Sequence, residues 1–456
     1  MLLALTSTAV SADTDQNSDL DLIPQAVQQA LPNTAPARLS KGRFYIEDAF
    51  SRAWSRSGVA MPPPASAGYT WQNRTSFDAI DQWNLAPTLS ARLSDRFDVL
   101  KESDFDFISS QTVRNELREG YLTWEPATRR YLEAGRINLR NGVALGFNPT
   151  DFFRSRSQLP QTSLDPSALR ENRLGAAMVH AQSIWNDGSL SLAYAPQLQQ
   201  PRPLQAPPPS ALNPQFDRSN GSSRWLLSMS WHMADLSPQA LVFREGNQTR
   251  LGLNLSQGIG RSIVAYAEWA AGPQLPLAAE AEAFGKQTGA LPADAPLLIG
   301  SADRRFRNDL AAGASWTDAA KVTVNLEYHY HQAGFSHGDW QEWFAKEDAQ
   351  GDVAGTKEAL WYLRAYASDR QDPATRQQIF LRVDWADAFL SKLELSTFGI
   401  IDTDDGSSLI QASVKYDASA RWTVAAYLEE YVGGRHSEFG SLPQSGGVIL
   451  SVILYF

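Results

Sequence analysis

Polar and apolar residues alternate along many short stretches of this chain. This period of two is typical of β-strands whose two faces meet different surroundings. It is clear in the stretches 225–231, 251–255, 322–330 and 410–416. The chain ends on the same pattern, because Val448, Leu450, Val452, Leu454 and Phe456 fall on one face. No run of 18 apolar residues occurs, which excludes a transmembrane helix but leaves a membrane-spanning β-barrel open.

The connections between the predicted strands decide between a barrel and a soluble sheet. We count about 18 strands from residue 70 onward, including separate strands at 85–95 and 98–108. The long connections all fall on one parity, at 141–173, 199–222, 272–307, 333–375 and 432–445. Bacterial barrels have short periplasmic turns and long extracellular loops, whereas a soluble sandwich has no reason to keep this parity. The sequence therefore predicts an all-β fold, a transmembrane antiparallel β-barrel of about 18 strands, with 16 as the alternative.

Aromatic residues precede five of the short turns. They are Trp124, Trp185, Trp316, Trp385 and Tyr416. An amphipathic ring is most stable at a membrane interface, so five rings at equivalent depth predict an aromatic girdle.

The first 68 residues divide into two segments before the predicted barrel at 69–456. Residues 1–12 resemble a signal peptide that lacks its basic start, because a short apolar stretch precedes Val10-Ser11-Ala12. Residues 13–68 contain a partly helical pattern and the stiff linker 61–65. We expect them to form either a periplasmic arm that binds a partner or a plug in the lumen.

The composition and the missing motifs argue against several classes of function for this protein. The net charge of −10 argues against nucleic acid as a partner, and the absence of Cys excludes thiolate metal sites and cysteine nucleophiles. The motifs of serine hydrolases, P-loop proteins, HExxH metalloproteases and dinucleotide-binding enzymes are missing. We therefore expect no enzyme activity and no cofactor. His329, His331 and His337 could supply metal ligands, but lumen-facing imidazoles are the simpler interpretation, and we predict no metal site.

Positive charge concentrates in one part of this acidic chain. Residues 114–173 contain ten Arg, no Lys and seven acidic residues. Charged residues of a barrel avoid the lipid face, so the alternation predicts a lumen row. The predicted pore-lining residues are Arg114, Glu116, Arg118, Arg136, Asn138 and Arg140. Guanidinium groups bind carboxylates bidentately, so this row selects anions or forms an internal Arg–Glu network that fills the lumen.

Glu119 and Glu133 interrupt this row, because they fall on the opposite parity. Either they lie at the membrane edge or a β-bulge shifts the register.

Two long loops could narrow the pore. Loop 141–173 combines aromatic residues with the constriction candidates Asn148, Asp151, Arg154 and Arg156, and it folds inward or outward. Loop 333–375 has spacing that predicts short helices over the mouth.

These features together resemble the porin-like barrels of Gram-negative outer membranes, over residues 69–456. A narrower stretch, residues 131–153, resembles the strand and Asn-Pro-x-Asp loop of alginate-export-type barrels. The resemblance implies a substrate-conducting outer-membrane channel, inserted among outer-membrane lipids by the barrel-assembly machinery. The arginine row leads us to expect a polar, anionic solute or polymer. Two alternatives stay open: a structural sleeve around a subunit of a secretion or electron-transfer complex, and an outer-membrane enzyme.

Overall fold

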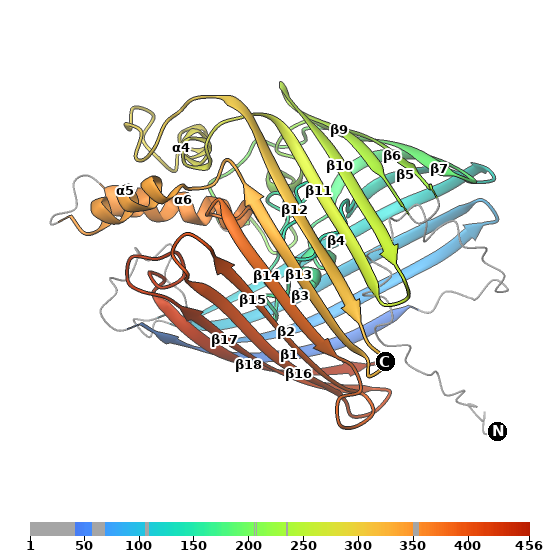
Figure 1. Cartoon of the computed structure of the whole chain (residues 1–456). Helices are drawn as coiled ribbons and strands as arrows, with labels where there is room; N and C mark the ends of the chain where they lie inside the picture. Colours follow the sequence, from blue (N-terminus) through green and yellow to red (C-terminus); the bar gives the residue numbers. More distant parts are fainter. Residues whose placement is uncertain are drawn as a thin grey trace.

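A computed structural model describes residues 42–56, 69–104, 109–204, 206, 208–233, 236–349 and 355–456. Its strands form one antiparallel sheet of 18 strands that closes on itself, because β1 pairs with both β2 and β18. Figure 1 shows the tilted strands of this barrel. None of the helices in the described part of the chain is long and apolar enough to cross a membrane.

The strands follow the chain around the barrel in sequence order. They are β1 Arg43–Ser55, β2 Tyr69–Ala86, β3 Leu89–Asp104, β4 Ser109–Ala127, β5 Arg130–Ile137, β6 Ala176–Trp185, β7 Gly188–Ala195, β8 Arg224–Trp231, β9 Gln239–Glu245, β10 Gln248–Ile259, β11 Ile263–Gln274, β12 Arg305–Thr317, β13 Val322–His331, β14 Gln377–Trp385, β15 Leu393–Asp402, β16 Ser408–Asp417, β17 Trp422–Val432 and β18 Gln444–Tyr455. The helices are α2 Pro166–Glu171, α3 Phe216–Ser219, α4 Leu277–Thr288, α5 His337–Glu347 and α6 Thr356–Arg370.

The predicted barrel class and strand number are confirmed, but two differences in the strand assignment offset each other. The barrel starts before the predicted boundary at residue 69, because β1 belongs to its wall. The two strands predicted at 85–95 and 98–108 are one strand, β3, and the chain turns at 87–88. Residues 1–41 and 57–68, with the predicted signal peptide and the linker at 61–65, lie outside the described residues.

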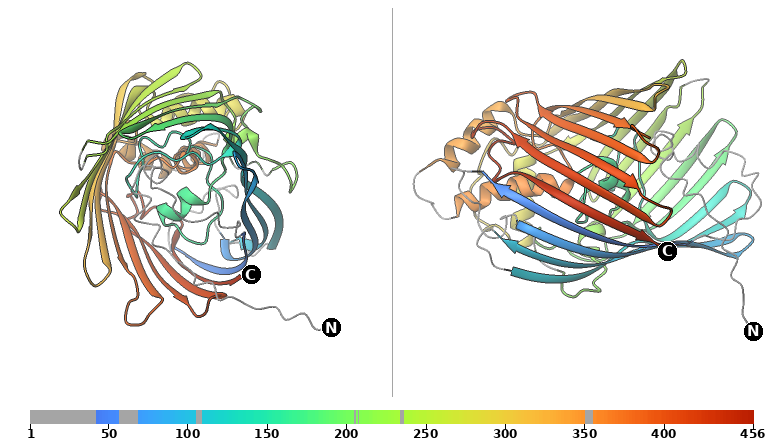
Figure 2. Two further views of the ribbon diagram at one scale, coloured as in Figure 1. Left: turned by 90° about the vertical axis from the view of Figure 1, so that its right-hand side faces the viewer. Right: turned by 90° about the horizontal axis from the view of Figure 1, so that it is seen from below.

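The long connections lie at one end of the barrel, as their parity predicts, and we call it the loop end. The helices α4, α5 and α6 gather there, while the C-terminus lies at the opposite, turn end (Figures 1 and 2). The girdle residues Trp124, Trp185, Trp316 and Tyr416 are 36–48% exposed and close their strands at the turn end.

Candidate functional site: a loop that crosses the lumen

The connection between β5 and β6, residues 138–175, folds into the barrel, and we call it the lumen loop. Figure 2 (left) shows this chain and its helix α2 inside the ring of strands. Its side chains and backbone bond to three separate parts of the wall, on β11 and β13, on β2 and β3, and on β14 and β16. The loop therefore spans the cross-section of the lumen, and the inward alternative of the sequence analysis agrees with this geometry.

Two buried carboxylates hold the first part of this loop by its backbone. Glu268 on β11 accepts hydrogen bonds from the amides of Val143 and Ala144, the latter at 2.6 Å. Glu327 on β13 accepts from the amides of Leu145 at 2.6 Å and Gly146 at 2.9 Å. Four successive backbone amides thus donate hydrogen bonds to two carboxylates. Without these acceptors the amides would be unsatisfied donors inside the barrel.

Each carboxylate also binds side chains, so its remaining lone pairs are used. Glu268 accepts from Asn148 Nδ2 at 3.1 Å and from Thr150 Oγ1 at 3.0 Å. Glu327 accepts from the Tyr266 hydroxyl and lies 2.7 Å from His329 Nε2. This arrangement fixes one conformation of the loop, because a fully satisfied buried network has few alternatives.

Glycine makes this close approach feasible. A Cβ atom on Gly146 would lie 2.7 Å from His329 Cε1 and from Phe380 Cγ, closer than real contacts allow. Gly142 has φ +94° and lies so near the Glu268 carboxylate that a Cβ would stand 2.5 Å from Oε1. At these two positions the backbone approaches the wall so closely that a side chain would not fit.

Aromatic contacts seal the loop against the same wall. Phe147 packs edge-on against His329 and His331, with ring centroids 5.8 and 5.9 Å apart. Phe152 stacks on Phe243 of β9 at 4.6 Å. These rings replace solvated lumen by a packed layer on this side of the barrel.

Asp151, in the tight turn of this loop, forms its most enclosed ion pair. Arg173 donates to both of its oxygens, at 2.8 and 3.0 Å, and both side chains are about 1% exposed. Burial opposes ionisation of Asp151, but Arg173 and Arg170 outweigh it and hold the pKa of this carboxyl below its usual range. The pair therefore stays charged above the ordinary pKa of aspartate.

The second half of the lumen loop crosses to the opposite wall. Arg74 and Arg96, on β2 and β3, both donate to the carbonyl oxygen of Pro160 at 2.8 Å. Arg382 on β14 donates to Asp165 at 2.9 Å, at the start of α2. The arginines of the wall thus contact the loop as well as their acidic neighbours.

The lumen loop is also tied to the helices at the loop end. Arg154 binds Asp372, and Arg156 binds Asp369 at the end of α6, at 3.3 Å. The helices α4, α5 and α6 share an apolar core that includes Trp343, Leu360 and Leu363. The predicted helices over the mouth are thus present, and they are coupled to the lumen loop by two ion pairs.

The predicted pore-lining residues of β4 face inward but are largely paired. Glu116 lies 2.6 Å from Arg96, and Arg118 bonds to Asp78; Glu116, Arg118 and Asp78 are at most 3% exposed. Arg114 is half-buried beside them, and its Nε has no hydrogen-bond partner. These contacts form an internal Arg–Glu network, which is one of the two arrangements that the arginine-rich stretch predicts.

A bulge explains the parity conflict at Glu119. Ser94 pairs with Glu119 and Asp95 with Leu117, which leaves Arg118 as the extra residue of β4. Beyond the bulge Glu119 and Glu133 face the lumen, where they bind Arg92 and His180. The bulge alternative of the sequence analysis is therefore the correct one.

The bulge also changes the position of Arg136. This residue pairs with Gly120 and Ala177, on the opposite parity from the lumen-facing Glu133. Its guanidinium donates to the carbonyl oxygens of Gly175 and Pro214, and the side chain is 4% exposed. Arg136 therefore does not continue the row of Arg114 and Arg118.

The other predicted residues belong to the lumen loop or its start. Asn138 bonds to the backbone of Arg170 and Glu171, and it accepts from Arg173 at 2.7 Å. Arg140 is 26% exposed and lies 4.0 Å from Glu171. Arg140 is thus the most accessible arginine among those whose ion pairs we have described in this loop.

Glu268 and Glu327 were not among the residues that the sequence pattern predicted for the site, although both lie on the polar faces of recognisable strands. The available signal was an acidic residue at a position that alternates with apolar ones, opposite a loop with two glycines. Of the histidines considered as metal ligands, His329 and His331 bond to Glu327 and Asp309, whereas His337 lies at the loop end.

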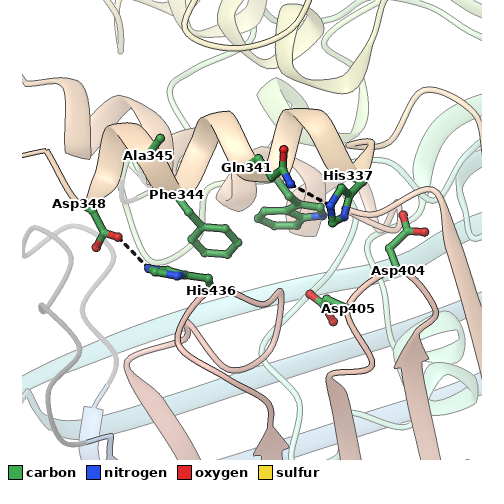
Figure 3. A pocket seen from close by; sticks show the side chains of 9 residues that line it. His337, Gln341, Phe344, Ala345, Asp348, Asp404, Asp405 and His436 are labelled. Carbon is green, nitrogen blue, oxygen red and sulfur yellow. Dashed lines mark hydrogen bonds and ion pairs between the residues drawn. The ribbon is translucent and has the colours of Figure 1, made fainter.

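A pocket of about 380 Å³ opens beside α5 at the loop end. Figure 3 shows Phe344 and His337 on the helix side, with Asp404 and Asp405 across from them. Asp348 also lines it and pairs with His436 at 2.7 Å. No Lys or Arg is among its lining residues, so this part of the mouth is acidic.

Glu438, whose amide donates to the pocket residue Asp405 at 2.6 Å, gives the mouth an expected pH dependence. Burial and the nearby Asp402 raise the pKa of Glu438 from its ordinary 4.5 to about 8, although Arg364 opposes the shift. A raised pKa means that ionisation is disfavoured in the folded state, so stability falls as the pH rises from about 4.5 to about 8. Arg364 of α6 donates to the Glu438 carbonyl, which couples this loop to α6.

We therefore expect hydrogen exchange of α6 and of residues 433–443 to speed up over this pH range, beyond the chemical exchange trend. Glu438→Gln should remove the extra acceleration. The same pH dependence in this variant and in the unmodified protein would assign it to another group.

Comparison with solved structures supports the fold. Pseudomonas aeruginosa OccK8 (OprE) superposes with a TM-score of 0.52 at 9% identity, covering 91% of this chain and 98% of that one. OccK11 (OpdR) and OpdQ of the same organism give 0.50 at 11% and 12% identity, covering 91% and 92% of this chain and 96% and 99% of theirs. These are outer-membrane porins, so the chain has a porin-like β-barrel fold. No family model and no curated protein matches the sequence.

Proposed function

We propose that this protein is an outer-membrane channel for a polar solute, with the lumen loop as its constriction. The observation that carries the proposal is the loop itself, which crosses a closed 18-stranded barrel and is anchored on opposite walls. A rigid loop inside a barrel narrows the water-filled path without closing the wall. The turn end then faces the periplasm and the loop end faces the outside, because bacterial barrels have short periplasmic turns and long extracellular loops.

We propose a modest preference for anionic solutes. The lumen loop contains five Arg and three acidic residues, a net charge of +2 in a chain of net −10. Confined positive charge attracts anions over about one Debye length, roughly 8 Å at physiological salt. Because most of these arginines are paired, the preference should be weak and should fade as salt rises.

The two alternatives gain less support. A sleeve needs a lumen that a partner can enter, whereas here the chain's own loop occupies the cross-section. The enzyme alternative finds no parallel among the structures that share the fold, which are porins.

Conductance in planar bilayers tests the proposal. We expect the purified protein to give stepwise conductance, with a reversal potential that indicates a slight anion preference at low salt. Arg140→Gln should shift this potential toward cations, because Arg140 is partly exposed.

Arg136→Gln is the matched control, since it removes the same charge from an enclosed position. It should lower the folded yield and leave selectivity unchanged. Absence of conductance would refute the channel, and an unchanged potential in Arg140→Gln would refute anion selection by this residue.

A further inference from the structure

The outward face of the barrel is apolar over most of its circumference. On β6 to β18 most outward positions near mid-strand are large apolar residues or alanines, with Thr397 and Gly399 of β15 as exceptions. Leu192, Leu253, Leu326, Leu381, Leu428 and Leu450 are representative and are 37–55% exposed. This is the surface that hydrocarbon chains require, because a polar group there loses its hydration without gaining a partner.

The outward face of β1 to β4 breaks this rule. Asp48 alternates with the buried Ala49 and so points outward, and it accepts from Thr75 Oγ1 at 2.7 Å and from Asn73 Nδ2 at 3.3 Å. Asp95 alternates with the buried Ser94 and Arg96, and it accepts from Asn115 Nδ2 at 3.1 Å. These five residues, Asp48, Asn73, Thr75, Asp95 and Asn115, form what we call the outward polar patch.

Both carboxylates of the patch lie at membrane depth. A strand tilted as in known barrels advances roughly 2.5 Å per residue along the membrane normal. Asp48 lies four residues beyond Phe44 at the turn end of β1, which is about 10 Å into the barrel wall by the same rule. Asp95 lies six residues beyond Leu89, the partner of the girdle residue Trp124, or about 15 Å. Both depths fall inside an apolar band about 25 Å tall.

The surroundings of the patch have the composition of a protein interface. Phe50 and Phe77 are 42% and 47% exposed and lie among the polar residues, and the Phe77 and Phe97 rings are 6.3 Å apart. Aromatic residues at the centre with polar groups around them are typical of contacts between proteins. A lipid-facing wall has the opposite order, with its polar groups only at the two membrane surfaces.

The charges on this face indicate what covers it. Arg52 and Lys101 are exposed near the loop end of the same strands as Asp48 and Asp95. The face therefore carries both signs of charge, with Arg52 and Lys101 near Asp48, Asp81 and Asp95. A surface with both signs is suited to self-association, which is the commonest form of assembly.

We propose that the outward face of β1 to β4 is the contact surface between two copies of this chain in the membrane. Both copies have the same orientation, so the symmetry axis runs along the membrane normal and brings groups of equal depth together. The carboxylates of the outward polar patch then gain protein partners instead of lipid. This inference rests on the proposed membrane location but does not require channel activity.

Single cysteines test this surface, because the chain has none of its own. Val99→Cys places a thiol on β3 beside Thr75, and Ala412→Cys places one at an outward mid-strand position of β16 as the matched control. In native outer membranes, a short bis-maleimide should join two copies through Cys at 99 but not at 412.

Each outcome has a distinct meaning. A product at twice the chain mass from position 99 alone supports the proposal. A product of another mass shows a different partner, and monomer at both positions shows a lipid-facing patch; either overturns it. Absence of the chain from the membrane fraction would refute the membrane location, and with it both this proposal and the proposed function.

Removing the charges provides a second measurement. Asp48→Leu with Asp95→Leu, in the Val99→Cys background, should weaken self-association roughly tenfold, as loss of buried polar contacts does in other interfaces. If these side chains faced lipid, the double substitution would stabilise the monomer against heat and leave cross-linking unchanged. The asparagine pair, Asp48→Asn with Asp95→Asn, keeps the hydrogen bonds and should restore part of the cross-linked fraction.

Discussion

Replacement of Glu268 and Glu327 by glutamine should free the lumen loop and enlarge the pore. Each carboxylate accepts two successive backbone amides of residues 143–146 as well as side-chain donors. Glutamine offers one acceptor oxygen and turns an NH₂ group toward donors. Each charge-assisted hydrogen bond lost in this way costs roughly 1.5–3 kcal/mol, so the double variant loses enough to make several loop conformations accessible.

Single-channel recordings measure this effect. We expect a higher mean conductance with more open-channel noise, together with faster hydrogen exchange of amides 143–146. Glu394→Gln is the matched control, because it removes one lumen charge from β15 beside Lys415, away from the amides that Glu268 and Glu327 hold. Unchanged conductance and protected amides in the double variant would mean that other contacts hold the loop.

Asp151→Ala should be among the most destabilising single substitutions in the lumen loop. It leaves Arg173 buried without its carboxylate, and loss of one partner of a buried ion pair costs about 3–5 kcal/mol. The remaining bonds of Arg173 to Asn138 and Leu139 cannot neutralise its charge. Because the pKa of Asp151 is lowered, the contribution of the pair is present above the ordinary aspartate pKa and is lost as the pH falls below it.

Thermal unfolding in detergent, followed by the mobility of unheated samples, measures this loss. The double variant Asp151→Ala with Arg173→Met should recover part of the midpoint, since it removes the uncompensated charge as well. Equal midpoints for the single and double variants would show that the loss comes from loop packing and not from charge.

The sequence by itself determined the barrel. Alternation of apolar and polar residues is a local property of each strand, and the parity of long and short connections follows from closing such strands into one sheet. The aromatic residues before the turns fixed the turn end for the same reason. These signals can be recognised without tertiary information because the membrane imposes one apolar face on most strands.

The sequence pattern did not identify strands correctly where the outward face of the barrel is not apolar. Residues 43–55 escaped detection because Asp48 and Arg52 interrupt the outward alternation of β1. The split of β3 into two predicted strands has a similar origin, since Asp95 and Arg96 stand side by side within it. The outward polar patch that we propose as a contact between copies is thus also what concealed these strands.

The contacts inside the lumen are determined by the tertiary structure and could not be predicted from local sequence patterns. Whether Arg136 continues a row of arginines depends on the bulge at Arg118, which only the pairing of β3 with β4 reveals. Partners of the lumen loop lie far away in the sequence, as with Val143 and Glu268, which are 125 residues apart. Local periodicity carries no information on such contacts, because they depend on which walls face each other after the barrel has closed.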